Sequence, residues 1–294
     1  MTQQSSHSRD EAPSVTTGAC LCGTTTPWNP RRAFVMAATA AIAAPAMAQV
    51  DVGNASSLRN LVPAETLEKS ATQQYDQLLA QAKAKRALAG DDNPQLIRLR
   101  DIAKRLIPYT YAWNERARGW RWEVNLVGSK QINAFCMPGG KIAFYTGIID
   151  QLKLTDDEIA MIMGHEMAHA LREHSRARIA KTQATNLGIS LGASLLGLGD
   201  VGRAAAGLGS QLLTLKFSRS DETDADLVGL ELAARAGYNP QASITLWEKM
   251  GKATGQQGLQ FLSTHPSGPH RIKELQENVA RVQGLYEAAR RNQK

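Results

Sequence analysis

The sequence predicts an α+β fold that is mainly helical, with a small antiparallel sheet beside a buried helix. Apolar residues recur at helical spacing over most of residues 56–294, and three short strand-like runs lie together within residues 120–146. The chain has 294 residues, of which 43% are hydrophobic and 21% charged. That length and composition are typical of a globular protein with a sizeable core, and they exclude a fibrous or wholly disordered chain.

Residues 1–48 are expected to form a signal peptide rather than part of the fold. Residues 1–30 are polar and lack hydrophobic periodicity, which is typical of disorder. Arg31-Arg32 then precedes an Ala-rich apolar run that ends in the cleavage signal Ala46-Met47-Ala48. The paired arginines with Phe34 resemble a twin-arginine signal, and the weak hydrophobicity of the run favours that route. The sequence therefore predicts export to the periplasm; an uncleaved N-terminal anchor is the alternative.

The mature chain is predicted to begin with an N-terminal helical segment, residues 49–92, followed by the main domain, residues 93–294. Residues 56–90 carry leucines among good helix formers. Asn93-Pro94 then marks the start of a second helix, because proline is favoured in a first helical turn. The apolar residues of this second helix recur at helical spacing: Leu96, Leu99, Ile102, Ala103 and Leu106.

Three strands are predicted next. Residues 120–127 alternate between apolar and polar side chains, and residues 132–137 and 141–146 are two further runs of strand type. The turn Pro138-Gly139-Gly140 separates the last two runs. Three short strands in succession indicate the small antiparallel sheet.

A largely apolar helix is predicted from Thr155 to about His174, since Thr155 and Glu158 form a capping box. Residues 186–216 are rich in Leu, Gly, Ala and Ser, and they indicate a hydrophobic hairpin of helices broken near residues 199–203. Buried core helices, a mobile lid and a surface-lying amphipathic element all fit this stretch. Further helices are predicted over residues 218–237, 240–252 and 269–294.

Charge and cysteine content narrow the function classes. The formal net charge is +7, but Lys and Arg are interspersed with Asp and Glu, and no nucleic-acid motif is present. We therefore expect no nucleic-acid partner; a mildly basic solvated surface or peripheral association with an anionic membrane surface accounts for the charge. Removal of the signal peptide would leave Cys136 alone, so the fold cannot rely on an internal disulfide.

The strongest chemical signal is His165-Glu166-Met167-Ala168-His169. On a helix, residues four apart share a face, so both imidazoles can reach one metal ion. Glu166 lies beside that face, where it can take a proton from a metal-bound water. The flanking residues are apolar, and a buried pair of histidines needs polar partners. Two core histidines with other partners remain the alternative to a metal site.

A catalytic zinc site needs a third protein ligand and one open position. Cys136 is a poor candidate because it lies on a strand next to a turn. The acidic cluster of residues 221–226 is better, since Glu222 and Asp226 are four apart on a predicted helix. Glu222 is expected to coordinate and Asp226 to accept a hydrogen bond from a ligand histidine. Without the histidine motif, these acids would be assigned to the dipole of a helix N-terminus.

Four groups of residues resemble the gluzincin peptidases of family 48, which include the CAAX prenyl proteases and the HtpX-like quality-control proteases. In chain order they are Asn133-Ala134-Phe135 with Pro138-Gly139-Gly140, His165-Glu166-x-x-His169 with His174, Ser218-Arg219-x-x-Glu222-x-x-Ala225-Asp226, and Ser263-Thr264-His265-Pro266 with Arg271-Ile272. The resemblance covers residues 95–285 and is greatest to the soluble periplasmic bacterial branch. It implies a zincin-like metallopeptidase domain, residues 93–294, with the sheet beside the active-site helix.

The resemblance also implies roles for individual residues. Glu222 is the expected third zinc ligand. The strand at Asn133, Ala134 and Phe135 is expected to bind an extended peptide by strand addition along the cleft. His265 is expected to face the metal and stabilise the oxyanion of the tetrahedral intermediate, the alternative being a turn residue before proline.

Two further residues are expected next to the ligands. His174 matches the family pattern, and either packing at the helix end or support of a ligand fits it. Arg271 is expected to pair with an acid near the site, for which Asp226 is the candidate.

Together these observations predict a zinc-dependent endopeptidase, with one Zn²⁺ per chain and Glu166 as general base, acting on misfolded or misassembled envelope proteins. A periplasmic chaperone or assembly factor for outer-membrane proteins is the first rival. A latent protease whose site is covered by residues 186–216 is the second. The oligomeric state stays open at this point.

Overall fold

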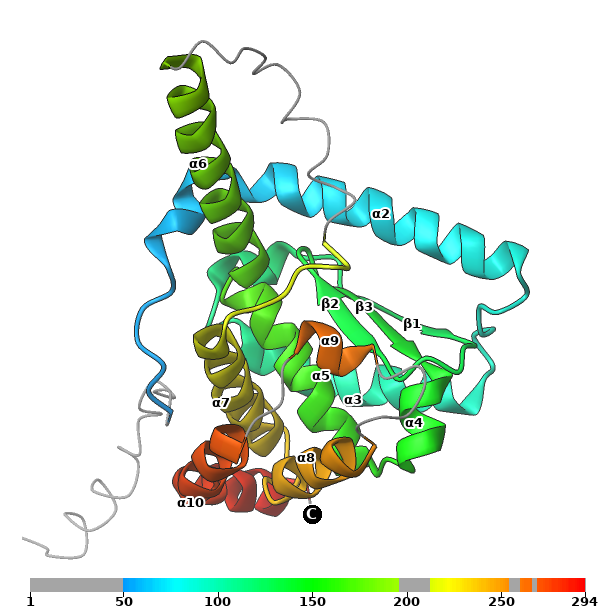
Figure 1. Ribbon diagram of the computed structural model, residues 1–294. Helices are drawn as coiled ribbons and strands as arrows, with labels where there is room; N and C mark the ends of the chain where they lie inside the picture. Colours follow the sequence, from blue (N-terminus) through cyan, green and yellow to red (C-terminus); the bar gives the residue numbers. More distant parts are fainter. Residues whose placement is uncertain (1–49, 196–211, 254–259, 266–268, 294) are drawn as a thin grey trace, which may run out of the picture. The chain divides into compact units, whose positions relative to one another are not determined.

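The computed structural model describes residues 50–195, 212–253, 260–265 and 269–293 (Figure 1). The expected signal peptide and Pro266 lie outside these residues, as does the middle of the 186–216 stretch. Residues 48–294 form one compact unit. Within the described residues, no helix is both long and apolar enough to cross a membrane.

A three-stranded sheet lies at the centre of the unit. The strands are β1 (Glu123–Val127), β2 (Ala134–Met137) and β3 (Lys141–Tyr145), in the order β1-β3-β2. β2 and β3 form the expected antiparallel hairpin, whose turn uses positive φ angles of 84° at Gly139 and 77° at Gly140.

The expectation of an all-antiparallel sheet was wrong, because β1 pairs with β3 in parallel. Residues 128–133 do not form a tight turn after β1. They bend around the end of β3 instead, where the amide of Gly147 donates to the carbonyl of Ser129 at 2.8 Å. The place beside β1 is therefore left for β3, and β2 becomes an edge strand.

The two faces of the sheet are covered by different helices (Figure 1). Helix α2 (Ala64–Ala84) lies on one face, where Ala71 and Tyr75 pack with Met137 and Ala143. The alternate residues of the strands, among them Ile142, point the other way into the main core. That core is shared with α3 (Pro94–Thr110) and α5 (Asp156–Leu171), and all five apolar residues expected on α3 are buried.

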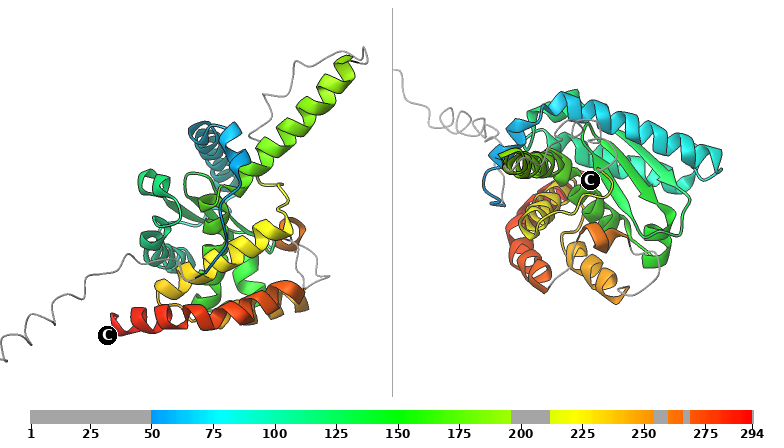
Figure 2. Two further views of the ribbon diagram at one scale, coloured as in Figure 1. Left: turned by 90° about the vertical axis from the view of Figure 1, so that its left-hand side faces the viewer. Right: turned by 45° about the horizontal axis from the view of Figure 1, so that its top comes forward.

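Helix α5 begins as expected with the capping box of Thr155 and Glu158. It ends earlier than expected, at Leu171, because Glu173 adopts a left-handed φ of 58° that breaks the helix. A new helix, α6 (His174–Leu195), starts directly after the break. Its first turns pack against the short helix η1 (Ser57–Leu61), as Figure 2 also shows.

Helix α7 (Arg219–Arg235) crosses α5 at very short range. The crossing point is a pair of glycines. A Cβ atom built on Gly229 would lie 2.5 Å from the amide nitrogen of His165, and one built on Gly164 would lie 2.8 Å from the carbonyl oxygen of Gly229. Only hydrogen atoms fit between these backbones, so the two glycines set the separation of the helices.

The remaining elements complete the unit. Helix α10 packs along α7 and also contacts α8 (Figure 2). The bounds of these elements are η2 (Glu115–Gly119), α4 (Thr146–Leu152), α8 (Ala242–Lys252), α9 (Phe261–Thr264) and α10 (Pro269–Arg291). The short elements η2, α4 and α9 were not predicted from the sequence.

Gly229→Ala is expected to lower the free energy of unfolding by about 1–3 kcal/mol, because the added methyl group must push α5 and α7 apart. Urea denaturation measures this change. Gly251→Ala on α8 is the matched control, since a Cβ atom there meets nothing within 4 Å. The control is expected to be neutral or stabilising by up to about 1 kcal/mol. Equal effects of the two substitutions would contradict the role assigned to the crossing.

Candidate metal centre

The two histidines of the HExxH motif meet on the buried side of α5. His165 and His169 are one helical turn apart, and their Nε2 atoms are 3.1 Å apart. Both side chains are buried, with exposed fractions of 4% and 2%. Two imidazole nitrogens bound to one zinc ion at 2.0–2.1 Å in tetrahedral geometry would be about 3.3 Å apart, so the observed spacing suits a shared ion.

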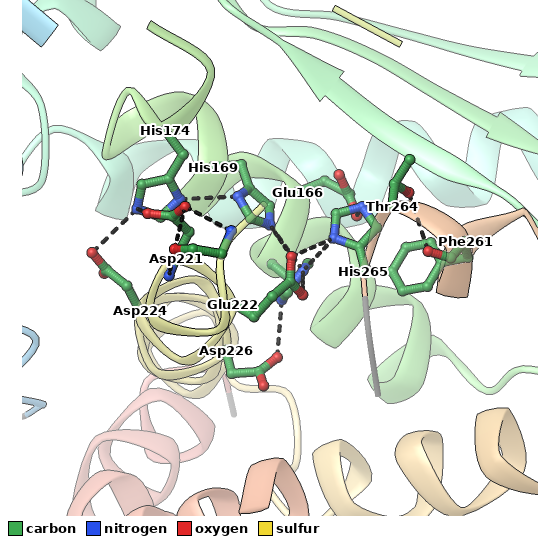
Figure 3. A network of polar contacts seen from close by, with 12 residues as sticks. Glu166, His169, His174, Asp221, Glu222, Asp224, Asp226, Phe261, Thr264 and His265 are labelled. Atoms are coloured by element: carbon green, nitrogen blue, oxygen red, sulfur yellow. Dashed lines mark hydrogen bonds and ion pairs between the residues drawn. The ribbon is translucent and has the colours of Figure 1, made fainter. Parts of the chain in front are cut away.

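Glu222 faces His169 from the first turn of α7 (Figure 3). Its carboxylate oxygens lie 3.6 Å from the Nε2 atoms of both His165 and His169. His265, at the end of α9, reaches the same point, with Nδ1 3.0 Å from Glu222 Oε1 and 3.3 Å from His165 Nε2. The ligand atoms of these four buried residues all lie within 4.8 Å of one another.

The protonation of these groups fits a metal ion. His165 Nδ1 is 2.9 Å from Asp226 Oδ1. An ionised carboxylate can only accept, so this nitrogen carries the proton and Nε2 keeps its lone pair. Burial and the neighbouring histidines lower the pKa of His169 well below its usual value, which leaves a neutral imidazole as a metal ligand requires. Lone pairs and a carboxylate that converge on one point provide the nitrogen and oxygen donors that zinc binds.

Arg271 of α10 holds the two acids of α7 in place. It donates to Asp226 through Nε at 2.6 Å and Nη2 at 2.7 Å, and Nη1 lies 2.8 Å from Glu222 Oε2. The guanidinium also stacks on Trp247, with Cζ 3.7 Å from the ring centroid. Burial alone would raise the pKa of Asp226, but Arg271 and His165 outweigh it and lower that pKa to about 2. The expected pairing of Arg271 with Asp226 is therefore present.

His174 contacts a ligand rather than only packing at a helix end. Its Nδ1 lies 2.9 Å from His169 Nδ1, and its Nε2 lies 3.2 Å from Asp224 Oδ2. Asp224 was not singled out from the sequence, because it was one of several acids in a run. Phe217 was also missed, although its ring stacks on His169 with centroids 3.9 Å apart. No residue spacing in the sequence marks either contact.

Glu166 lies beside the ligands with its side chain buried. Its Oε1 is 3.5 Å from His265 Nε2 and has no hydrogen-bond partner among the described residues. Burial raises the pKa of this carboxyl above its ordinary value, although the charges of His265 and His165 oppose the shift. For His265, burial lowers the pKa, but Glu166 and Glu222 outweigh it and the net shift is upward. A carboxylate with a raised pKa and a free oxygen suits transfer of a proton.

A cleft connects this centre to the edge of the sheet. Its walls include residues 133–138 of the β2 edge, together with Glu166, His169 and His265. The segment Leu212–Phe217 lines the same cleft through Leu212, Leu213, Leu215 and Phe217. The structure thus places Asn133, Ala134 and Phe135 next to the candidate metal ligands.

Comparison with known proteins identifies the family. The model of peptidase family M48 matches residues 97–279, which is more than half of the chain. The chain therefore belongs to peptidase family M48, and the resemblance to family 48 is confirmed. The enzyme class expected from the HExxH motif, a metalloendopeptidase, agrees with this family and with the geometry of the site.

Individual relatives match over a little more than half of the chain. Mitochondrial metalloendopeptidase OMA1 of Schizosaccharomyces pombe is 39% identical over 166 residues, which are 55% of this chain and 48% of that protein. OMA1 of Arabidopsis thaliana is 39% identical over 170 residues, or 58% of this chain and 34% of its own length. Metalloprotease LoiP of Escherichia coli is 28% identical over 182 residues, which are 61% of this chain and 71% of that protein. The chain thus spans about half of the length of the Schizosaccharomyces pombe protein and about a third of the length of the Arabidopsis thaliana protein.

Arg271→Met is expected to lower the free energy of unfolding of the metal-free protein by about 3–5 kcal/mol, because it leaves Glu222 and Asp226 buried without their cation. Added zinc is expected to restore part of the loss, since a cation again faces Glu222. Lys273→Met on the same helix is the control; its pair with Glu277 is exposed and is worth less than about 1 kcal/mol. Urea denaturation with and without zinc measures both, and a small effect at Arg271 would contradict its assigned role.

Proposed function

We propose that this member of peptidase family M48 is a zinc-dependent endopeptidase of the bacterial cell envelope that hydrolyses misfolded or misassembled polypeptides. One observation carries the proposal: the edge of β2, the candidate general base Glu166, the candidate ligand His169 and His265 line a single cleft. A peptide held along that edge passes directly over the chemical groups that can cleave it.

Substrate binding is assigned to strand addition on β2. One side of β2 pairs with β3, and among the described residues no strand pairs with its other side. Main-chain hydrogen bonds to a free edge provide affinity without requiring a particular side chain. Unfolded polypeptides of varied sequence are the substrates that such a site favours, because a folded protein has few extended segments to offer.

His165, His169 and Glu222 are the residues assigned to hold Zn²⁺. When bound there, zinc supplies a Lewis acid and lowers the pKa of a water molecule. Glu166 accepts the proton of the attacking water and delivers it to the leaving amine, for which its raised pKa and free Oε1 are suited. His265 is assigned to the oxygen of the scissile carbonyl, because its imidazole lies at the same point as the ligands and its raised pKa favours the donor form.

A chaperone for outer-membrane proteins is the second candidate, favoured by the leucines Leu212, Leu213 and Leu215 that line the cleft together with β2. An apolar wall and a free strand edge can hold an unfolded chain without cleaving it. These leucines belong to the 186–216 stretch, so they also support a latent enzyme with a covered site. An increase in protease activity on deletion of residues 186–216 would support the latent form.

Glu166→Gln is expected to retain about one zinc ion per chain but to cleave unfolded casein at least 10²-fold more slowly, because the general base is lost while the ligands remain. Metal content by mass spectrometry and the cleavage rate are measured together. Glu248→Gln, an exposed substitution on α8, is the control and is expected to match the wild type.

The outcomes separate the candidates. If the wild type and Glu166→Gln both contain zinc and neither cleaves casein, an active protease under these conditions is excluded and the chaperone is favoured. Complementation of a deletion strain by Glu166→Gln would point the same way.

Export by the twin-arginine route is tested on the signal peptide itself. Replacing Arg31 and Arg32 by lysine is expected to retain the full-length chain in the cytoplasm, because this pathway requires the arginine pair. Cell fractionation and the mass of the purified product measure location and cleavage. Arg9→Lys is the control, because it makes the same arginine-to-lysine exchange outside the pair. Normal export of the doubly substituted protein would contradict the proposed route.

A further inference from the structure

We infer that Asp224, His174 and Arg172 form a positioning relay that fixes the tautomer and the orientation of His169. This inference rests on the proposed metal centre, in which His169 is a ligand. It assigns roles to Asp224 and Arg172, which neither the sequence nor the family resemblance marked.

The hydrogen-bond directions follow one from another. The Asp224 carboxylate can only accept, so the contact of 3.2 Å places a proton on His174 Nε2. In the neutral imidazole, His174 Nδ1 then carries a lone pair, and it can only accept from His169 Nδ1 across 2.9 Å. His169 therefore has its proton on Nδ1, and its Nε2 lone pair faces His165 and Glu222. Figure 3 shows Asp224, His174, His169 and Glu222 in this order.

The relay is the counterpart of the contact that orients the other ligand. His165 is held directly by Asp226, whereas His169 is held by Asp224 through one intervening imidazole. Both acids lie on α7, so one helix orients both histidines of α5. Partners of this kind raise the basicity of a ligand histidine and reduce its freedom to turn.

The break after α5 is what makes the relay possible. In a continuous helix, residue i+5 is rotated by roughly 140° from residue i, so His174 would point away from His169. The left-handed conformation of Glu173 interrupts the helix and folds the His174 ring back over the preceding turn. This break brings together two rings whose centroids are 5.0 Å apart.

Arg172 fastens the relay to the N-terminal part of the unit. Its Nε donates to Asp224 Oδ2 at 2.8 Å, and its Nη2 donates to the carbonyl of Gly53 at 2.8 Å. The segment that supplies this carbonyl is itself fixed, because the amide of buried Val50 donates to Glu231 on α7 at 3.1 Å. Residues 50–53 therefore hold the side chain of Arg172 in place, and Arg172 in turn holds the carboxylate of Asp224.

The experiment measures zinc affinity by competition with a chelator in the full-length protein, so that it does not depend on turnover. Asp224→Ala and His174→Phe are each expected to raise the zinc dissociation constant 10- to 100-fold. The double variant is expected to have a zinc dissociation constant no higher than that of either single variant, because the two substitutions break the same relay. Asp101→Ala, an exposed position on α3, is the control and is expected to leave the constant unchanged.

Two further readouts separate positioning from a general structural effect. Asp224→Asn keeps an acceptor oxygen for His174 and is expected to keep most of the affinity. Nitrogen NMR of the histidines in zinc-free protein is expected to show the His169 proton on Nδ1 in the wild type, and a mixture of tautomers in Asp224→Ala and His174→Phe.

Wild-type zinc affinity in both single variants, or a His169 proton on Nε2 in the zinc-free wild type, would overturn the relay. Failure of the wild type to bind zinc would overturn the proposed metal centre instead, and the NMR result would then decide the relay by itself.

Discussion

The close crossing of α5 and α7 is the constraint on which the rest of the site depends. Gly164 and Gly229 let two helix backbones touch, and their neighbours then face each other across the contact. His165 follows Gly164 directly, whereas Glu222 and Asp226 lie seven and three residues before Gly229 on the same side of α7. The ligand geometry is therefore a consequence of backbone packing, and no loop has to close to assemble it.

The crossing also concentrates charge in a buried place, and that charge must be compensated. Glu166, Glu222 and Asp226 are all nearly inaccessible to water. Arg271 supplies one positive charge from α10, in contact with Glu222 and Asp226, and a Zn²⁺ ion at the convergent ligand atoms would supply two more. The C-terminal helix, distant in sequence from the HExxH motif, is thus part of the electrostatic balance of the centre.

The sequence predicted the features that rest on local patterns. Helical periodicity located α3, and the capping box located the start of α5. The metal ligands followed from the HExxH spacing together with an acidic helix, and the family resemblance added His265 and Arg271. Each of these signals is contained within a few neighbouring residues, so each could be seen without knowledge of the fold.

The features that were missed depend on contacts between distant segments. The parallel pairing of β1 with β3 depends on the path of residues 128–133 around the end of another strand. The end of α5 depends on the backbone of Glu173, whose side chain type does not favour a left-handed conformation. A prediction that continues the helix through Glu173 cannot foresee the contact of His174 with His169. Without that contact, nothing distinguishes Asp224 from the other acids of its run.

The choice of nitrogen and oxygen ligands affects how metal binding responds to oxidation. Within the part of the chain that the structure describes, the converging donors are nitrogen and oxygen atoms alone. Cys136 lies buried on β2, and burial together with the charge of Glu166 raises the pKa of its thiol well above the usual value. A protonated thiol is a poor nucleophile and a poor ligand, so it competes little for the metal and reacts slowly with oxidants. Metal binding at this centre should therefore be insensitive to the redox potential of the surroundings, unlike a thiolate site.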